Sequence, residues 1–372
     1  MRDTERGRSD DTDATPEPAM LRMIELTGAY RSMSPAALPL ARLSMFSRLR
    51  EAWRILAAAI VLGLTTGGAH AADKVVFVTN WYAEAEHGGF YQALAEGIYL
   101  RYGLDVSIRM GGPQVNVYQL LLAGQADFAM GYDIATLNAI EQGLPLVTVA
   151  ATFQADPAVM IAHPDVKELA DLKTRTLLIG QASETTFWPW LKAKYGFTDA
   201  QKRPYSFSVQ QFLVDMNVAQ QGYATSEPYS VQKGGVTPKV FLLAASGYPP
   251  YAETIVTLAK TVKDKPDMIR RFVEATALGW KSYLVNPAPG NALIKRDNPQ
   301  LEDDLLAFGV ARMKDFGLVT GGDAASQGIL TMTDVRWKQT FDFMAQAGLI
   351  KRDVDYRKAY TLELVKQVKV LP

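Results

Sequence analysis

Short apolar strands alternate with amphipathic helices along this chain, and this alternation restricts its fold more than any other feature. Residues 74–79 have the character of a buried strand, and in residues 90–102 apolar side chains recur at every fourth position. Further strand patterns cover residues 104–110, 127–131 and 145–151. Strands that alternate with helices predict βαβ units and a mostly parallel sheet, so the expected fold class is α/β.

A second α/β run begins near residue 174 and leads into a mainly helical tail. Its expected strands cover residues 175–180, 206–209, 223–225 and 239–244, and the tail has helical patterns at 266–285, 302–315 and 333–347. Apolar stretches at 158–163 and 253–260 flank this run. One α/β unit inserted into another through two such crossings predicts a ligand cleft between two lobes.

The two crossings divide the expected mature chain. We predict that lobe 1 combines residues 72–157 with 258–372, including the helical C-terminal part, and that lobe 2 comprises residues 158–257. Polar residues 1–44 show no sustained apolar period, so they are expected to be disordered or to result from a start codon assigned too early.

Residues 45–71 have the three parts of a secretory signal peptide. An arginine-rich stretch precedes the apolar run 55–64, and Ala69-His70-Ala71 forms a small-residue cleavage motif. The apolar run is about ten residues long, which is short for a transmembrane helix. A membrane anchor or a buried helix is the alternative interpretation. We expect cleavage after Ala71 and export to the periplasm.

The composition excludes several classes of function. Lysine plus arginine and aspartate plus glutamate both number 39, so no basic excess points to nucleic acid. The chain has no cysteine, which rules out disulfides, iron–sulfur clusters and thiol nucleophiles. Because there are also only three histidines, we expect neither a metal site nor a cofactor.

The loops that follow the expected strands contain no lysine or arginine, but they are rich in carboxylates and aromatic rings. The carboxylates are Glu84, Glu86, Asp133, Glu184 and Glu227. A site for nitrate, sulfonate or phosphate would need guanidinium or ammonium groups. Aromatic stacking and carboxylate acceptors suit a flat ring that is neutral or weakly basic.

Nine residues of these loops are the predicted ligand-binding set. They are Trp81, Tyr82, His87, Gly112, Asn116, Tyr132, Trp188, Glu227 and Tyr229.

Each has a structural alternative. Trp81 or Trp188 could fill a core, His87 could cap the helix after it, and Glu227 suits the start of a helix before Pro228. Gly88-Gly89 could be a plain turn or a place where a ligand approaches the backbone. Glu84 and Glu86 are the kind of carboxylates that are usually solvated.

Several of these residues resemble those of the thiamine-pyrimidine-precursor-binding family, a branch of the wider nitrate, sulfonate and taurine binders. The resemblance rests on Asn80-Trp81, His87-Gly-Gly-Phe-Tyr91, Gly103-Leu-Asp-Val106, Gly111-Gly-Pro113 and Ser226-Glu-Pro228. It implies a two-lobed type II periplasmic-binding-protein fold and an ABC permease and ATPase as partners. It also implies a hydroxymethyl- or formylamino-pyrimidine ligand, with Trp81 and Tyr229 stacking on the ring and Glu227 accepting from its amine.

Other functions remain open at this stage. Residues 82–86 depart from the loop associated with pyrimidine binders, so nitrate-like anions, sulfonates or other heterocycles are alternatives. The same family includes thiamine pyrimidine synthases, but these carry a cysteine-rich iron-binding motif that this chain lacks. A hydrolase is disfavoured because there is no G-x-S-x-G sequence. A monomeric binding protein for import is expected, with a sensor subunit as the third alternative.

Overall fold

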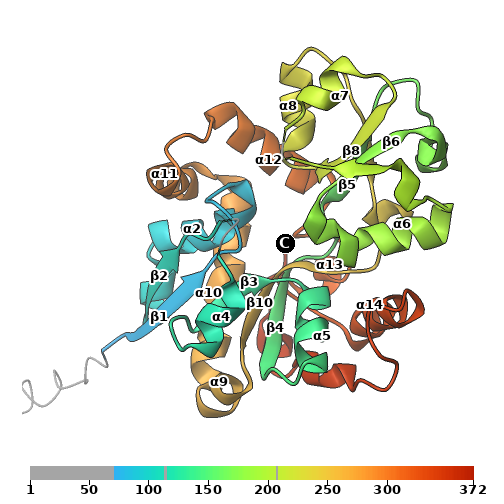
Figure 1. Ribbon diagram of the computed structural model, residues 1–372. Helices are drawn as coiled ribbons and strands as arrows, with labels where there is room; N and C mark the ends of the chain where they lie inside the picture. The colour runs from blue at the N-terminus through green and yellow to red at the C-terminus, as the bar shows by residue number, and fades with distance from the viewer. Residues whose placement is uncertain (1–70, 113–114, 207) are drawn as a thin grey trace, which may run out of the picture. The chain divides into compact units, whose positions relative to one another are not determined.

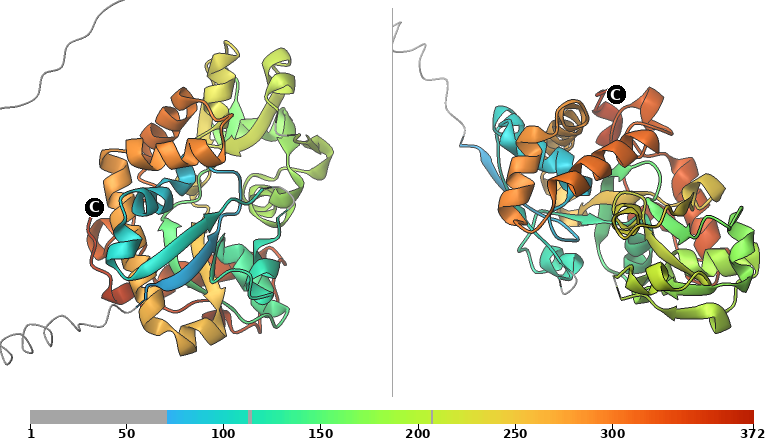
Figure 2. Two further views of the ribbon diagram at one scale, coloured as in Figure 1. Left: turned by 90° about the vertical axis from the view of Figure 1, so that its left-hand side faces the viewer. Right: turned by 90° about the horizontal axis from the view of Figure 1, so that it is seen from above.

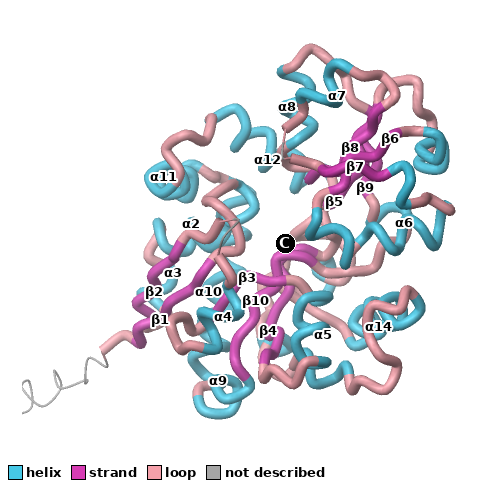
Figure 3. Tube along the Cα trace, viewed as in Figure 1, coloured by secondary structure: helices cyan, strands magenta, loops and turns pink. Residues whose placement is uncertain are grey.

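The strands in the described part of the chain form two separate five-stranded sheets (Figure 1, Figure 3). The structure is a computed structural model that describes residues 71–112, 115–206 and 208–372. The first sheet contains β1 (Asp73–Val78), β2 (Leu104–Arg109), β3 (Phe128–Gly131), β4 (Leu146–Phe153) and β10 (Ala252–Leu258) in the order β2-β1-β3-β10-β4. The second contains β5 (Ala158–Ala162), β6 (Thr176–Ile179), β7 (Lys202–Pro204), β8 (Val218–Tyr223) and β9 (Lys239–Leu242) in the order β7-β6-β8-β5-β9. We name the part around the first sheet lobe 1 and the part around the second lobe 2.

Both sheets are mixed, which differs from the mostly parallel arrangement expected. Strand β1 pairs parallel with β2 and β3, but β10 pairs antiparallel with β3 and β4. In the second sheet β6 pairs parallel with β7 and β8, whereas β5 is antiparallel to β8 and β9. The two antiparallel strands are the first strands after each crossing. The chain enters the second sheet at β5 and returns to the first sheet at β10.

The chain passes between the sheets twice, after β4 and after β9. The second passage ends before β10, whose partners all belong to the first sheet. We therefore propose that lobe 2 ends before Ala252 and not at residue 257, while its start at residue 158 coincides with β5. The green and yellow segments of lobe 2 stay grouped to one side of lobe 1 in both further views (Figure 2).

Thirteen labelled helices occur in the described part of the chain, and most follow the expected patterns. They are α2 (Gly88–Ala95), α3 (Ile98–Arg101), α4 (Val117–Leu122), α5 (Asp133–Glu141), α6 (Phe187–Tyr195), α7 (Gln210–Val214), α8 (Glu227–Lys233), α9 (Ala259–Asp264), α10 (Pro266–Val285), α11 (Ala288–Asp297), α12 (Asp303–Asp315), α13 (Ala324–Gln327) and α14 (Asp334–Gln346). The single helix expected over 90–102 is split, because Gly97 adopts φ 64° between α2 and α3.

Helix α10 forms the core of lobe 1 with the first sheet and α2. Its Phe272 ring stacks on Phe128 at 4.2 Å between centroids. A Cβ atom at Gly88 or Gly89 would overlap the rings of Tyr283 and Trp280, both buried on α10. The glycine pair therefore lets α2 lie directly against α10, which is a packing role within the helix and not that of a plain turn.

The predicted signal peptide lies outside the described residues, apart from Ala71, and so does the polar segment 1–44. Across residues 71–372, gaps excepted, none of the helices combines the length and the apolar character that a membrane span requires.

Candidate ligand-binding site

Residues at the ends of strands from both sheets meet in a hydrogen-bonded group. Glu253, at the start of β10, accepts from the hydroxyl of Tyr132 at 3.1 Å and from Nδ2 of Asn80 at 3.3 Å. Tyr132 follows β3, and its hydroxyl also bonds to the hydroxyl of Tyr223, the last residue of β8. The Tyr132–Tyr223 pair joins lobe 1 to lobe 2, so this group lies at the boundary between the lobes.

The turn before α2 adds two buried groups to this boundary. Glu86 is 3% exposed and accepts a hydrogen bond from the hydroxyl of Thr225, a residue of lobe 2. His87 is fully buried, and its Nε2 lies 3.3 Å from Oδ1 of Asn80. Burial lowers the pKa of His87 to about 3, so the imidazole is neutral at physiological pH. It can serve as a hydrogen-bonding group but brings no positive charge.

The carboxyl groups of this region repel one another, and they ionise only with difficulty. Burial raises the pKa of Glu84 well above its ordinary value, and the neighbouring carboxyls of Glu86, Glu253 and Glu227 raise it further. Burial raises the pKa of Glu253 to about 8 and that of Asp156, in the first passage between lobes, to about 7. Near neutral pH such carboxyls keep part of their protons, so they offer both O–H donors and oxygen acceptors.

We name Glu84, Glu86, Asp156 and Glu253 the carboxyl cluster. Among the described neighbours that shift the pKa of Glu84 or Glu253, none is a lysine or an arginine. No group of three or more histidine and carboxylate side chains in the described ranges is arranged to hold a metal ion. The buried carboxyls of the cluster can form hydrogen bonds to a donor-rich or positively charged partner.

Glu253 has an unusual backbone conformation and a carboxyl oxygen without a hydrogen-bond partner. Its backbone φ of 50° lies in the left-handed region that favours glycine. Its Oε2 atom is buried without a hydrogen-bond partner, although the residue is only 2% exposed. A buried carboxyl oxygen without a partner costs free energy, and a ligand that donates to it would recover that cost.

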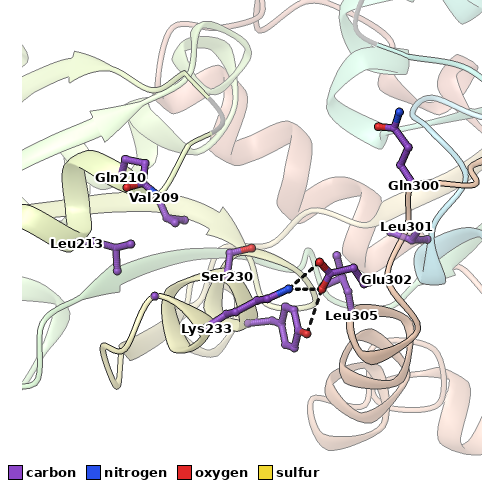
Figure 4. Close-up of a pocket in the computed structure, with 11 residues that line it drawn as sticks. Val209, Gln210, Leu213, Ser230, Lys233, Gln300, Leu301, Glu302 and Leu305 are labelled. Atoms are coloured by element: carbon purple, nitrogen blue, oxygen red, sulfur yellow. Dashed lines mark hydrogen bonds and ion pairs between the residues drawn. The ribbon is translucent and has the colours of Figure 1, made fainter.

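One cavity lies beside the cluster, and a second, larger cavity shares two lining leucines with it. The inner one, about 20 Å³, is lined by Glu84, Glu86 and Thr225 together with leucines of the α12 region. The outer one, about 480 Å³, lies between α7, α8 and the start of α12 (Figure 4). Leu301 and Leu305 line both. The inner cavity has room for about one water molecule, so an aromatic ring can bind there only when the lobes separate.

Four of the nine predicted residues lie at or beside the cluster, and Gly112 lies behind one of them. Tyr132 and His87 belong to the hydrogen-bonded group described above. Trp81 and Tyr82 follow Asn80 directly, and their rings meet edge to face at 5.6 Å between centroids. Tyr82 is 45% exposed, and a Cβ at Gly112 would lie 3.3 Å from its ring. A glycine at this position leaves the aromatic ring its space.

The other predicted residues have structural partners or lie further out. Asn116 caps α4 by accepting from the N–H of Gln119 at 3.1 Å. Trp188 is 1% exposed and donates to Asp199 at 2.8 Å, so it has almost no surface left for a ligand. Tyr229 lines the outer cavity.

Glu227 has partners for both carboxylate oxygens. It accepts from the N–H of Tyr223 at 2.7 Å, the hydroxyl of Ser226 at 2.6 Å and the hydroxyl of Tyr205 at 3.1 Å. Its carboxylate organises the turn between β8 and α8. An amine contact by Glu227 would have to compete with these three hydrogen bonds.

Sequence reasoning missed the buried carboxyls that make up the centre of the site. The sequence suggests that Glu86 is solvated, it places Glu253 in the expected crossing 253–260, and no pattern singles out Asp156, which precedes the other crossing. Asp133 and Glu184 were counted with the loops, but Asp133 accepts from the N–H of Tyr251 at 2.9 Å and Glu184 pairs with Lys202 at 2.9 Å. The sequence feature that indicated an acidic site without nearby cations was the absence of lysine and arginine from the loops at the strand ends.

Solved structures with this fold include periplasmic binding proteins. The periplasmic aliphatic sulphonate binding protein SsuA from Escherichia coli superposes with a TM-score of 0.55, covering 77% of this chain and 91% of that chain at 15% identity. At this identity the likeness establishes the two-lobed α/β fold alone, which confirms the predicted fold class.

Proteins with similar sequences bind or make nitrogen heterocycles. Riboflavin-binding protein RibY of Chloroflexus aurantiacus is 26% identical over 304 residues, which are 79% of this chain and 86% of that protein. Formylaminopyrimidine-binding protein of Halalkalibacterium halodurans is 28% identical over 110 residues, 29% of this chain and 33% of that protein. A 4-amino-5-hydroxymethyl-2-methylpyrimidine phosphate synthase of Saccharomyces cerevisiae is 30% identical over 79 residues, 21% of this chain and 23% of that protein.

The family match agrees with the resemblance carried by the motifs. The family described as NMT1/THI5 like matches residues 84–289, which include the turn before α2, all of lobe 2 and all of α10. Since this match spans more than half of the 372 residues, the chain belongs to the NMT1/THI5 like family.

Proposed function

We propose that this protein captures a flat nitrogen heterocycle between its lobes and delivers it to the permease and ATPase of an ABC importer. The observation that carries the proposal is the carboxyl cluster, which lies at the boundary between lobes and has no cation among the neighbours that shift its pKa values. An inorganic anion or a sulfonate would be repelled there. A ring that bears N–H or amine donors would be attracted.

The unpaired carboxyl oxygen of the cluster suits such a ring in a second way. The Oε2 atom of Glu253 is buried without a hydrogen-bond partner, and a ring amine or N–H group could donate to it. Such a bond favours the ionised form of a carboxyl whose pKa burial raises to about 8. Trp81, Tyr82 and Tyr132 supply aromatic faces, and stacking contributes about 1–3 kcal/mol per ring.

Two ligands fit this chemistry, and each has support from a relative. A thiamine pyrimidine precursor is our first candidate, supported by the formylaminopyrimidine-binding relative and by the shared motifs. Riboflavin is the second candidate, supported by a relative that matches 79% of this chain. Both are flat rings with several nitrogen atoms, and the carboxyl cluster does not by itself choose between them.

Several further parts of the proposal rest on the signal sequence and on the class of relatives. We propose that the protein is exported, that cleavage follows Ala71, and that the mature form works in the periplasm as a monomer. We do not propose a synthase activity. The similarity to the synthase covers only 21% of this chain, and the chain has no cysteine for a cysteine-rich iron motif.

A thermal-shift screen tests the proposed ligand class. Riboflavin, 4-amino-5-hydroxymethyl-2-methylpyrimidine, nitrate and methanesulfonate would each be added at 1 mM (roughly 100 times a Kd of about 10 μM, and so worth about 2.7 kcal/mol of stabilisation). We expect at least one of the two heterocycles to raise the Tm by several degrees and both anions to leave it unchanged. A shift with the anions and none with the heterocycles would refute the proposal.

A further inference from the structure

The outer contact between the lobes involves one acidic residue at the start of α12. Glu302 accepts from Nζ of Lys233 at 2.6 Å through Oε1 and at 2.5 Å through Oε2 (Figure 4). It also accepts from the hydroxyl of Tyr229 at 3.3 Å. Lys233 and Tyr229 belong to α8 of lobe 2, whereas α12 follows α11 in the part of the chain that returns to lobe 1. We name these three residues the latch.

The segment that carries Glu302 also separates the two cavities. Leu301 and Leu305 line the outer cavity of about 480 Å³ on one side and the inner cavity beside Glu84 and Glu86 on the other. The ring centroids of Tyr229 and Phe308, a residue of α12, lie 5.6 Å apart. A direct path from the outer cavity to the inner one passes these leucines, next to the latch.

Helix α12 is in contact with the inner site as well. A Cβ at Gly309 would lie 2.8 Å from the Cβ of Ala85 and 3.4 Å from the carbonyl oxygen of Thr225. Asn298, just before α12, donates to the carbonyl of Ala83 at 2.9 Å. The helix thus contacts the turn that carries Glu84 and Glu86 and also the lobe 2 residue that hydrogen-bonds to Glu86. A separation at the latch would be transmitted to that hydrogen bond.

We propose that the start of α12 is a gate for the ligand, closed by Leu301 and Leu305 and held by the latch between Glu302 and lobe 2. This inference rests on the proposed function for the identity of what passes the gate, but the latch itself can be tested without ligand. Both ion-pair partners are exposed, so the latch is weak and reversible. A weak latch suits a protein that must release its ligand to a transporter.

The first test measures lobe separation in the ligand-free protein. Because the chain has no cysteine, Leu100→Cys and Val214→Cys would carry spin labels at exposed positions of α3 and α7 without background. We expect Glu302→Lys, which places two lysines together, to shift the distance distribution to longer values and raise the open population about threefold or more. The matched control is Asp342→Lys, which breaks an equally exposed pair with Lys338 within α14. Equal distributions for Glu302→Lys and the control would overturn the latch.

The second test measures passage of riboflavin. Lys233→Cys and Glu302→Cys would be joined by a short reducible bis-maleimide, and loading would be followed by riboflavin fluorescence in stopped flow. We expect loading to slow at least tenfold when the link is made and to recover when the link is cleaved. The same linker across Lys338→Cys and Asp342→Cys should have no effect. If the cross-linked protein loads riboflavin at the uncrosslinked rate, the ligand enters by another path and the gate is refuted. If the unmodified protein does not bind riboflavin, riboflavin is not the ligand, and the distance measurement above decides whether the latch exists.

Discussion

The lobes meet in two regions that differ in burial, charge and pairing. The inner region joins Glu86 to Thr225 and Tyr132 to Tyr223, among carboxyls that are buried and that repel one another. The outer region joins Glu302 to Lys233 and Tyr229, in an exposed ion pair of ordinary kind. The ion pair of the outer region can form and break in water at a small cost in free energy. Every change in the inner region, by contrast, alters the solvation of a buried carboxyl group.

This difference assigns different tasks to the two regions. A buried, poorly paired group destabilises the closed state until a ligand supplies the missing partner, so the inner region makes closure depend on the ligand. An exposed pair adds little selectivity and holds the lobes only briefly. The carboxyl cluster would then decide what is bound, and the latch would influence how fast it enters and leaves.

The largest effect on stability is expected from Glu253→Gln. In the folded protein the pKa of Glu253 is raised to about 8 from an ordinary 4.5, so its protonated form stabilises the fold below about pH 4.5 and this contribution is lost as the pH rises towards 8. Glutamine keeps an acceptor for Asn80 and Tyr132 but cannot ionise. We expect the variant to be more stable than the wild type by on the order of 2–4 kcal/mol at pH 8.5, and nearly equal to it at pH 4.5.

Urea unfolding across this pH range measures the difference. Glu363→Gln, at an exposed position, is the matched control and should follow the wild type at every pH. If Glu253→Gln and the wild type lose stability in parallel between pH 4.5 and 8.5, the carboxyl of Glu253 is not held in its protonated form and the contrast between the two regions is lost.

A smaller effect is expected from Thr225→Val, which keeps the shape of a buried side chain but removes the donor to Glu86. A buried acceptor left without its donor costs about 1–3 kcal/mol, though separation of the lobes would let water restore part of this. We expect the free energy of unfolding to fall by about 1 kcal/mol at pH 7. Thr174→Val, at an exposed position, is the control. An unchanged stability for Thr225→Val would show that this contact contributes nothing to the inner region.

Much of the fold was predictable because its signals are local. Helix α10 begins and ends at the expected residues, Pro266 and Val285, since its apolar period is long and a proline occupies its first turn. Helix α11 was missed, because Pro289 and Gly290 disfavour a helix and its stability comes from contacts with α2, such as the Gly290 N–H bond to Gln92 at 2.7 Å.

The candidate site was less predictable because burial of a carboxyl is not a local property. Glu84 and Glu86 look like solvated residues in a loop, and only the approach of Thr225 from lobe 2 removes Glu86 from water. Glu253 looks like part of a strand. In contrast, the position of Tyr132 at the lobe boundary follows from a local signal, because the residue directly follows a buried strand. Its contact with ligand stays a prediction.

The exchange of protons on binding tests the central claim most directly. Isothermal titration at pH 7.5 in two buffers of different ionisation enthalpy would measure the protons released or taken up when the heterocycle that stabilises the protein in the thermal screen binds. A ligand that donates hydrogen bonds to Glu84 and Glu253 favours their ionised forms, so we predict proton release by the wild type and less release by Glu253→Gln. Proton uptake, as an anion near these carboxyls would require, or no exchange at all would contradict the account.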